Sequence, residues 1–320
     1  MLTDCGQRFF YRYILGIKRP PSAFMLVGTS THRSVTRNLD NKIETGDLLK
    51  RDEAIGAAEE KFDAEQKLTP IELEADDKRE GLSLDTVLAE ARDKSVSLAG
   101  LHYDQAAPTI NAKRTERKFS INMDSFLRER ARDLHTAASS LDDKYMAKRL
   151  HSQAKAMNSA ARTGIDFAGE QDILEERVDD QFIKLIVRDT KTSGKSPSKS
   201  FMDGSATAGI ADDSDQLTGY ALASQVIDGK LPDLMVLDYL VRTPARHDLK
   251  YVPTKTVRTM DDVQVFLNRF ANAVQAYRTG IFVPAKADWW GCSEKWCAYW
   301  SMCPYAKRPT LIQIQTEVPK

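Results

Sequence analysis

Two apolar segments joined by a short acidic stretch constrain the fold of this chain more than any other feature. Residues 165–174 and 182–189 have the length and composition of strands, and residues 178–181 between them predict a hairpin turn. The two strands are therefore expected to be antiparallel neighbours. A helix-like segment at 215–228 and an apolar strand at 234–241 follow. This order predicts a small mixed β-sheet flanked by helices, which is an α/β (α+β) fold.

Most of the remaining chain has the apolar spacing of helices. We expect a strand at 109–121 and helices at 1–15, from Gly28 onwards, at 46–100 with breaks at Pro70 and Gly81, at 123–162 and at 260–278. Residues 123–162 contain neither Gly nor Pro, so we interpret them as a helical insertion between two strands. The expected parts are a helical region at 1–108, a core at 109–258 that carries the insertion, and a C-terminal helix and cysteine segment at 259–320.

The charge balance excludes few functions. Lys and Arg number 46, as do Asp and Glu, which argues against non-specific coating of nucleic acid. A local basic channel beside a cluster of acids stays compatible with a net charge of zero. No apolar run is long enough to span a bilayer, and the first residues lack the pattern of a secretory signal. We therefore expect a cytoplasmic protein without a membrane partner.

Two acids and a lysine lie on the two strands of the predicted hairpin. Asp172 lies in the first strand, and Asp189 and Lys191 end the second. Two neighbouring carboxylates repel each other unless a divalent cation lies between them. Because Asp189 and Lys191 are two residues apart, their side chains share one face of a strand. The lysine can then stabilise charge that develops on a phosphate while a metal-bound water attacks it.

The motifs around these residues resemble those of the PD-(D/E)XK nuclease superfamily. The pattern is Gly169-x-x-Asp172, then an apolar strand that ends in Asp189-x-Lys191-Thr, then Gln216-x-x-x-Tyr220. Within that superfamily the chain looks like the RecB-like exonucleases, including CRISPR-associated and phage-encoded members. Those proteins also carry a histidine on an upstream helix, which His32 matches here.

The resemblance implies a restriction-endonuclease-like core and a set of functional residues. It implies that Mg²⁺ or Mn²⁺ is bound by His32, Asp172, Asp189 and the carbonyl of Thr190. It also implies that Lys191 is the catalytic cation and that Gln216 and Tyr220 line the site from the following helix. Glu116, on the preceding strand, is a further candidate for assisting the metal.

Four cysteines are placed unevenly along the chain. Cys5 lies near the N-terminus, and Cys292, Cys297 and Cys303 lie close together near the C-terminus. This placement favours a four-thiolate site that joins the first helix to the C-terminal segment like a staple. A subset of RecB-like nucleases holds a [4Fe-4S] cluster in this way, and the resemblance implies the same here. Structural Zn²⁺ and four reduced core cysteines are the alternatives.

The sequence leaves several functions open. The leading hypothesis is a metal-dependent DNA exonuclease of a phage or mobile element, with a role in recombination, replication or repair. A second is a CRISPR spacer-processing nuclease that works with an integrase. A third is a non-catalytic iron–sulfur subunit that binds DNA within a helicase–nuclease complex. A homo-oligomer or a helicase or recombination partner is compatible with each hypothesis. Lys191, Lys195 and Lys199 are candidate phosphate contacts.

Overall fold

The computed structural model describes residues 4–162, 164–179, 182–197, 211–243, 247–286 and 288–306. Its centre is a five-stranded sheet with the strand order β1-β2-β3-β4-β5. The strands are β1 (Ala112–Asn122), β2 (Asp166–Asp179), β3 (Phe182–Ser193), β4 (Leu234–Arg242) and β5 (Leu249–Thr256). β3 and β4 are parallel and all other neighbours are antiparallel. The predicted mixed sheet is confirmed.

The parallel pair explains the helix between β3 and β4. Parallel neighbours cannot be joined by a tight turn, so the chain crosses over through α9 (Asp215–Ile227). β5 was not expected from the sequence. It lies at the edge of the sheet and contains Pro253, which weakens a strand pattern but is tolerated in edge strands.

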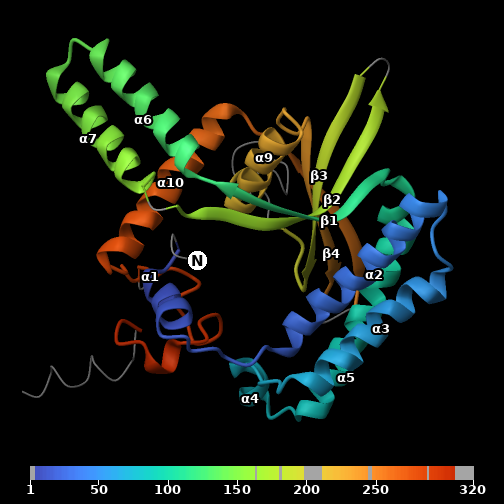
Figure 1. Ribbon diagram of the computed structural model, residues 1–320. Coiled ribbons are helices and arrows are strands. Elements are labelled where there is room, and N and C mark those ends of the chain that lie inside the picture. The colour runs from blue at the N-terminus through green and yellow to red at the C-terminus, as the bar shows by residue number, and fades with distance from the viewer. Residues whose placement is uncertain are drawn as a thin grey trace, which may run out of the picture.

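Helices cover both faces of the sheet (Figure 1). Besides α9, the chain forms α1 (Gly6–Phe9), a π-helical turn η1 (Phe10–Ile14), α2 (Ala23–Thr45), α3 (Arg51–Leu68), α4 (Ala75–Glu80), α5 (Leu84–Leu101), α6 (Asp124–Ser139), α7 (Lys144–Ala160) and α10 (Met260–Thr279). Breaks near Pro70 and Gly81 separate α3, α4 and α5, as predicted. α6 and α7 form a hairpin of two helices between β1 and β2.

The predicted start of the second helix after Gly28 is wrong, because α2 begins at Ala23. The extended backbone of Ser22 directly after Pro20 and Pro21 marks the boundary. Gly28 lies inside the helix, where a glycine costs about 1 kcal/mol but does not end it. A Cβ atom there would make an ordinary contact, 3.6 Å from Thr192 Oγ1, so α2 passes beside the end of β3 without requiring a glycine.

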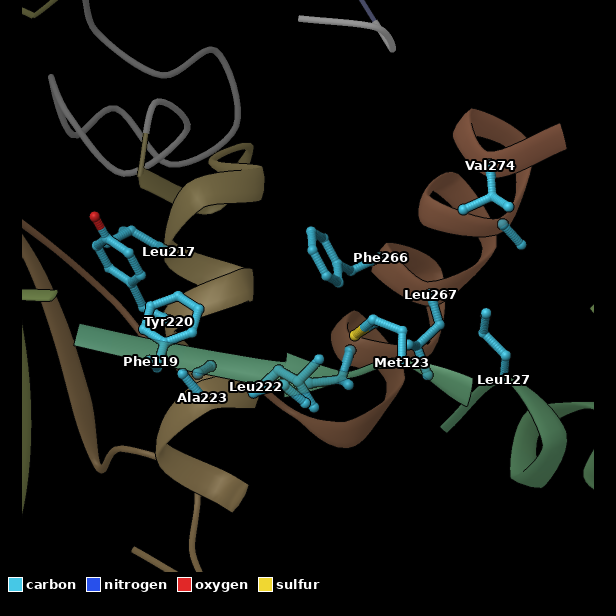
Figure 2. Close-up of a cluster of buried hydrophobic side chains, with 14 of the residues drawn as sticks. Phe119, Met123, Leu127, Leu217, Tyr220, Leu222, Ala223, Phe266, Leu267 and Val274 are labelled. Carbon is cyan, nitrogen blue, oxygen red and sulfur yellow. The ribbon is translucent and has the colours of Figure 1, made fainter. Parts of the chain in front are cut away.

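The largest core lies on the face of the sheet covered by α6, α7, α9 and α10. Figure 2 shows part of it, with Phe119 of β1 beside Tyr220 of α9 and with Phe266 and Leu267 of α10 across the core. α2, α3 and α5 cover the other face through smaller clusters that include Leu240 and Ile173 of the sheet. Helices therefore cover both faces of the central part of the sheet, whereas the tip of the β2–β3 hairpin is exposed at Val178, Phe182 and Ile183.

The two ends of the described chain lie side by side (Figure 1). Gly6 N donates a hydrogen bond to Val283 O over 2.8 Å, and Tyr299 OH donates one to Ile17 O over 2.9 Å. A Cβ atom on Gly6 would lie 2.6 Å from Val283 N, so only glycine permits this approach. The expected contact between the first helix and the cysteine segment is thus made by protein groups themselves.

Within the part of the chain that the structure describes, none of the helices combines the length and apolar character needed to cross a bilayer.

Candidate active site

β1 changes its side-chain pattern at Glu116. Arg117 Nη2 donates to Ser224 Oγ of α9 over 3.0 Å, whereas Thr115 donates to Asp40 of α2 on the other face. Residues two apart on a regular strand share a face, so the chain must be irregular between them. The irregularity is Glu116, whose φ is +45°, a conformation that is uncommon for a residue with a side chain.

β2 changes its pattern at the matching position. Gln171 Nε2 donates to Tyr220 O of α9 over 2.9 Å, whereas Ile173 packs beside Val35 of α2. The registers Thr115–Ile173 and Arg117–Gln171 place Glu116 directly opposite Asp172. Glu116 and Asp172 therefore lie side by side at the position where the side-chain alternation of both strands is interrupted. Neither side chain is buried in a hydrophobic cluster on either face of the sheet.

His32 of α2 contacts both acids. Its Nε2 atom lies 3.1 Å from Asp172 Oδ2, and its Nδ1 atom lies 3.7 Å from Glu116 Oε1. Thr36, one helical turn further along α2, donates to Glu116 Oε1 over 3.1 Å. Thr190 N also donates to Asp172 Oδ2, over 3.0 Å, and joins β3 to the same group. One helix and three strands thus converge on Asp172.

Asp189, Lys191 and Gln216 form the second half of the site. Lys191 Nζ lies 2.6 Å from Asp189 Oδ2 and donates to Gln216 Oε1 over 3.0 Å. Gln216 Nε2 donates to Asp189 Oδ1 over 2.9 Å and to Tyr220 OH over 2.7 Å. Ser214 caps α9 by accepting from Leu217 N, which places Gln216 in the first turn and Tyr220 one turn later. The glutamine therefore holds the acid and the lysine together.

Burial and like charges shape the titration of the site. Burial, together with the neighbouring Asp172 carboxylate, raises the pKa of Asp189 to about 6 despite the Lys191 ammonium. Burial opposes protonation of His32, but the hydrogen bond to Asp172 and the nearby acids raise its pKa overall. Burial and Asp189 raise the pKa of the Tyr220 hydroxyl, which therefore stays protonated at neutral pH. The site therefore holds buried carboxylates whose negative charge the neighbouring cationic side chains neutralise only in part.

The donor atoms fit a hard divalent cation in chemistry. Asp189 Oδ2 is buried and accepts no well-aligned hydrogen bond from any described residue, although Lys191 lies beside it. Carboxylate and carbonyl oxygens are the ligands that Mg²⁺ and Mn²⁺ prefer. No three His, Cys, Asp or Glu side chains of the described residues converge in a metal-binding arrangement. His32 and Lys191 instead pair with the carboxylates that a cation would contact.

A buried charge network supports the site from the opposite face of β3. Arg188 Nε donates to Glu175 Oε2 over 2.6 Å, and Arg188 Nη1 donates to Asp238 Oδ1 over 3.0 Å. Both acids are fully buried, and Tyr251 OH donates to Asp238 Oδ1 over 2.6 Å. Because Arg188 directly precedes Asp189, the network fixes the backbone that presents Asp189. The sequence analysis missed these residues, although an arginine within the apolar strand 182–189 was a visible signal.

The four cysteines line one cavity between the two chain ends. Cys5 and Cys303 are buried, Cys292 and Cys297 are partly buried, and all four are free thiols. Burial and the neighbouring sulfur atoms raise the pKa of Cys292, and burial raises that of Cys297. The structure thus gathers the predicted residues in one place, while no metal-binding arrangement exists among them in the described chain.

Comparison with known protein families decides the identity of the fold. A family model of the PD-(D/E)XK nuclease superfamily matches residues 1–304. The chain belongs to the PD-(D/E)XK nuclease superfamily. No match was found among curated proteins, and none among solved structures. The mixed five-stranded sheet flanked by helices is consistent with the restriction-endonuclease-like fold of this superfamily.

Membership in the PD-(D/E)XK superfamily makes this chain a nuclease with DNA as its substrate. The sequence-predicted residues Asp172, Asp189 and Lys191 lie together, with His32 in contact with Asp172 and Gln216 in contact with Asp189 and Lys191. Glu116 was only a candidate in the sequence, and the structure places it opposite Asp172. Of the candidate phosphate contacts, Lys199 lies outside the described residues.

Proposed function

We propose that the protein is a Mg²⁺- or Mn²⁺-dependent deoxyribonuclease that degrades DNA from its ends. Recombination, replication or repair of phage or mobile-element DNA is the proposed setting. The single observation that carries the proposal is the Asp189–Lys191–Gln216 contact set beside Asp172 and His32. A structural ion pair would not need a second acid and a histidine held beside it.

The proposed metal ligands are His32, Asp172, Asp189 and the Thr190 carbonyl. When bound, the cation supplies an activated water and neutralises charge on the phosphate. Lys191 keeps an ammonium aimed at the place where charge develops on phosphorus. Gln216 Oε1 accepts a hydrogen bond from the Lys191 ammonium, and the Tyr220 hydroxyl accepts one from the Gln216 amide. These two bonds hold the ammonium in position. Thr190 N orients the Asp172 carboxylate through its hydrogen bond.

The test compares wild type with Lys191→Ala and, as a control, Lys67→Ala, which removes an exposed lysine of α3. Purified protein is incubated with end-labelled linear DNA and with circular DNA, each single- or double-stranded, with Mg²⁺, Mn²⁺ or EDTA. We expect linear DNA to be degraded only with metal and circular DNA to persist. Loss of one well-placed charge donor should slow cleavage about 10²- to 10³-fold. Equal cleavage by wild type and Lys191→Ala would show that the active-site assignment is wrong.

We propose further that Cys5, Cys292, Cys297 and Cys303 hold a [4Fe-4S] cluster, with structural Zn²⁺ as the alternative. Their shared cavity supports the proposal, because it brings the four cysteines together between the chain ends, where a bound metal centre would stabilise the thiolate forms that burial disfavours. Anaerobic purification followed by visible absorption and analysis of iron, sulfide and zinc distinguishes the two. Colourless protein with one equivalent of zinc would exclude the cluster.

A further inference from the structure

The α6–α7 hairpin has no role in the proposed chemistry. It leaves the sheet after Asn122 of β1 and returns at Asp166 of β2, and Figure 1 shows both helices projecting away from the sheet. Its base packs on α10, where Arg278 Nη1 donates to Ser159 O over 2.7 Å. Its inner face is apolar through Leu127, Leu134 and Met157. The side chains of α6 and α7 that point away from this inner face are exposed to solvent.

α7 carries positive charge without any negative charge. Its residues 144–160 include Lys144, Lys148, Arg149 and Lys155 and contain no Asp or Glu. Lys144, Lys148 and Lys155 recur at the spacing that places residues on one side of a helix, and His151 lies between them. All four side chains are exposed. None of the three lysines forms an ion pair with any residue that the structure describes.

α6 extends the same flank of the hairpin. His135 Nδ1 of α6 and His151 Nδ1 of α7 lie 2.9 Å apart, which aligns the two helices along this flank. Arg132 lies three residues before His135, on the same side of α6, and is exposed. Glu129 lies three residues before Arg132 and is its neighbour on α6, whereas α7 contributes no acid to this side. We call the surface formed by Arg132, Lys144, Lys148 and Lys155, together with the two histidines, the basic flank.

We propose that the basic flank binds the phosphodiester backbone of the DNA that is held in the active site. The inference rests on the proposed function and adds a second contact surface to it. The net charge of the chain is zero, so a flank whose three lysines form no ion pair with any described residue is a local feature that complements a polyanion. The lysines are separated by about 6 and 10 Å along the helix axis, at about 1.5 Å per residue. Such a stripe can follow successive phosphates.

The distance from the active site sets which part of the DNA is bound. Asp166, at the foot of the hairpin, is six residues along β2 from Asp172, or about 20 Å at 3.3 Å per residue. At about 3.4 Å per base pair, this corresponds to about 6 base pairs of duplex. A short oligonucleotide in the active site therefore does not reach far along the basic flank, whereas a long one does.

The test replaces three lysines of the flank by glutamine, as K144Q/K148Q/K155Q. The matched control replaces three exposed lysines elsewhere, as K50Q/K67Q/K250Q. A third protein, K144R/K148R/K155R, keeps the charge. Binding of labelled DNA of about 6 and about 30 base pairs is measured by fluorescence anisotropy in EDTA, over a range of salt concentrations. The slope of log Kd against log salt counts the phosphates neutralised, at about 0.9 per contact for duplex DNA.

We expect the glutamine triple to lower that slope by about 2 to 3 on long DNA. The control triple and the arginine triple should keep the wild-type slope, and binding of the short DNA should be the same for all four proteins. A glutamine triple that keeps the wild-type slope overturns the proposal. So does an equal loss in the control triple, or a loss on the short DNA as large as on the long DNA.

Two further results separate this proposal from the nuclease assignment. If wild type cleaves DNA but the glutamine triple binds long DNA normally, the flank proposal alone fails. If wild type cleaves no DNA under any metal condition while the slope changes as expected, the nuclease assignment fails and the flank remains a DNA-binding surface. Tight binding of vesicles containing phosphatidylserine that depends on the three lysines, with no change in the DNA slope, would instead assign the flank to a membrane surface and overturn the proposal.

Discussion

Replacing Arg188 by methionine tests whether the buried network under β3 maintains the fold beneath the active site. Arg188 donates to Glu175 and to Asp238, both of which are 0% exposed. Removing one partner of a buried ion pair costs about 3 to 5 kcal/mol, because the remaining charge stays buried without compensation. Arg177 still donates to Glu175, and Tyr251 still donates to Asp238. We therefore expect a loss near 3 kcal/mol, at the lower end of that range.

The loss should depend on pH. Burial would raise the pKa of Glu175, but Arg188 and Arg177 hold it below its ordinary value. Burial raises the pKa of Asp238, and Arg188 limits that rise. Without Arg188, both carboxyls titrate at higher pH in the folded state. A carboxyl group whose pKa is higher in the folded than in the unfolded state destabilises the fold at pH values above that pKa. It has no effect at low pH, where the group is protonated in both states. The difference between variant and wild type should therefore shrink as the pH falls.

Urea unfolding followed by circular dichroism at about pH 7 and about pH 4.5 measures this difference. His102 is fully buried and its pKa is lowered to about 3, first by burial and then by Arg188. Wild type therefore loses stability as the pH falls below the ordinary value of a histidine, so the difference between the proteins is the quantity to compare. Arg177→Met, which removes a half-exposed arginine from the same Glu175, is the control, and its loss should be about 1 kcal/mol or less.

The buried-charge argument would be refuted if Arg188→Met lost less than the Arg177→Met control, or if its deficit grew as the pH fell. A triple variant that adds Glu175→Gln and Asp238→Asn to Arg188→Met removes all three charges. It should recover part of the stability, because no uncompensated charge is left in the core.

Two further outcomes are expected. Glu116→Gln keeps the shape of the side chain that accepts from Thr36 but removes the charge beside His32, so DNA cleavage should fall about 10- to 100-fold while the melting temperature stays within a few degrees; unchanged cleavage would remove Glu116 from the site. Cys297→Ala should abolish the visible absorption of the proposed cluster and lower the melting temperature more than it lowers the cleavage rate per folded molecule, and a fully stable, colourless variant would contradict the staple role.

Much of this arrangement was predictable from the sequence. The succession of β1, β2, β3, α9 and β4 along the chain and the helical insertion between β1 and β2 follow from apolar spacing and from the positions of Gly and Pro, whereas β5 was not expected. The spacing Asp189-x-Lys191 predicts a shared strand face, and Lys191 Nζ lies 2.6 Å from Asp189 Oδ2. The sequence also placed Gln216 on the helix after the strand, where it contacts both residues. These features are local, so a few neighbouring residues determine them.

Only the tertiary structure decided how the acids meet. The positive φ of Glu116 and the change of face at Asp172 turn two alternating strands into a site at one end of the sheet. A one-residue irregularity leaves the hydrophobic pattern of a strand almost unchanged, so the sequence does not reveal it. The buried partners of Arg188 lie on β2 and β4, and their pairing depends on strand register. The sequence by itself determined which chemical groups the protein carries, and the packing of distant strands decided which of them touch.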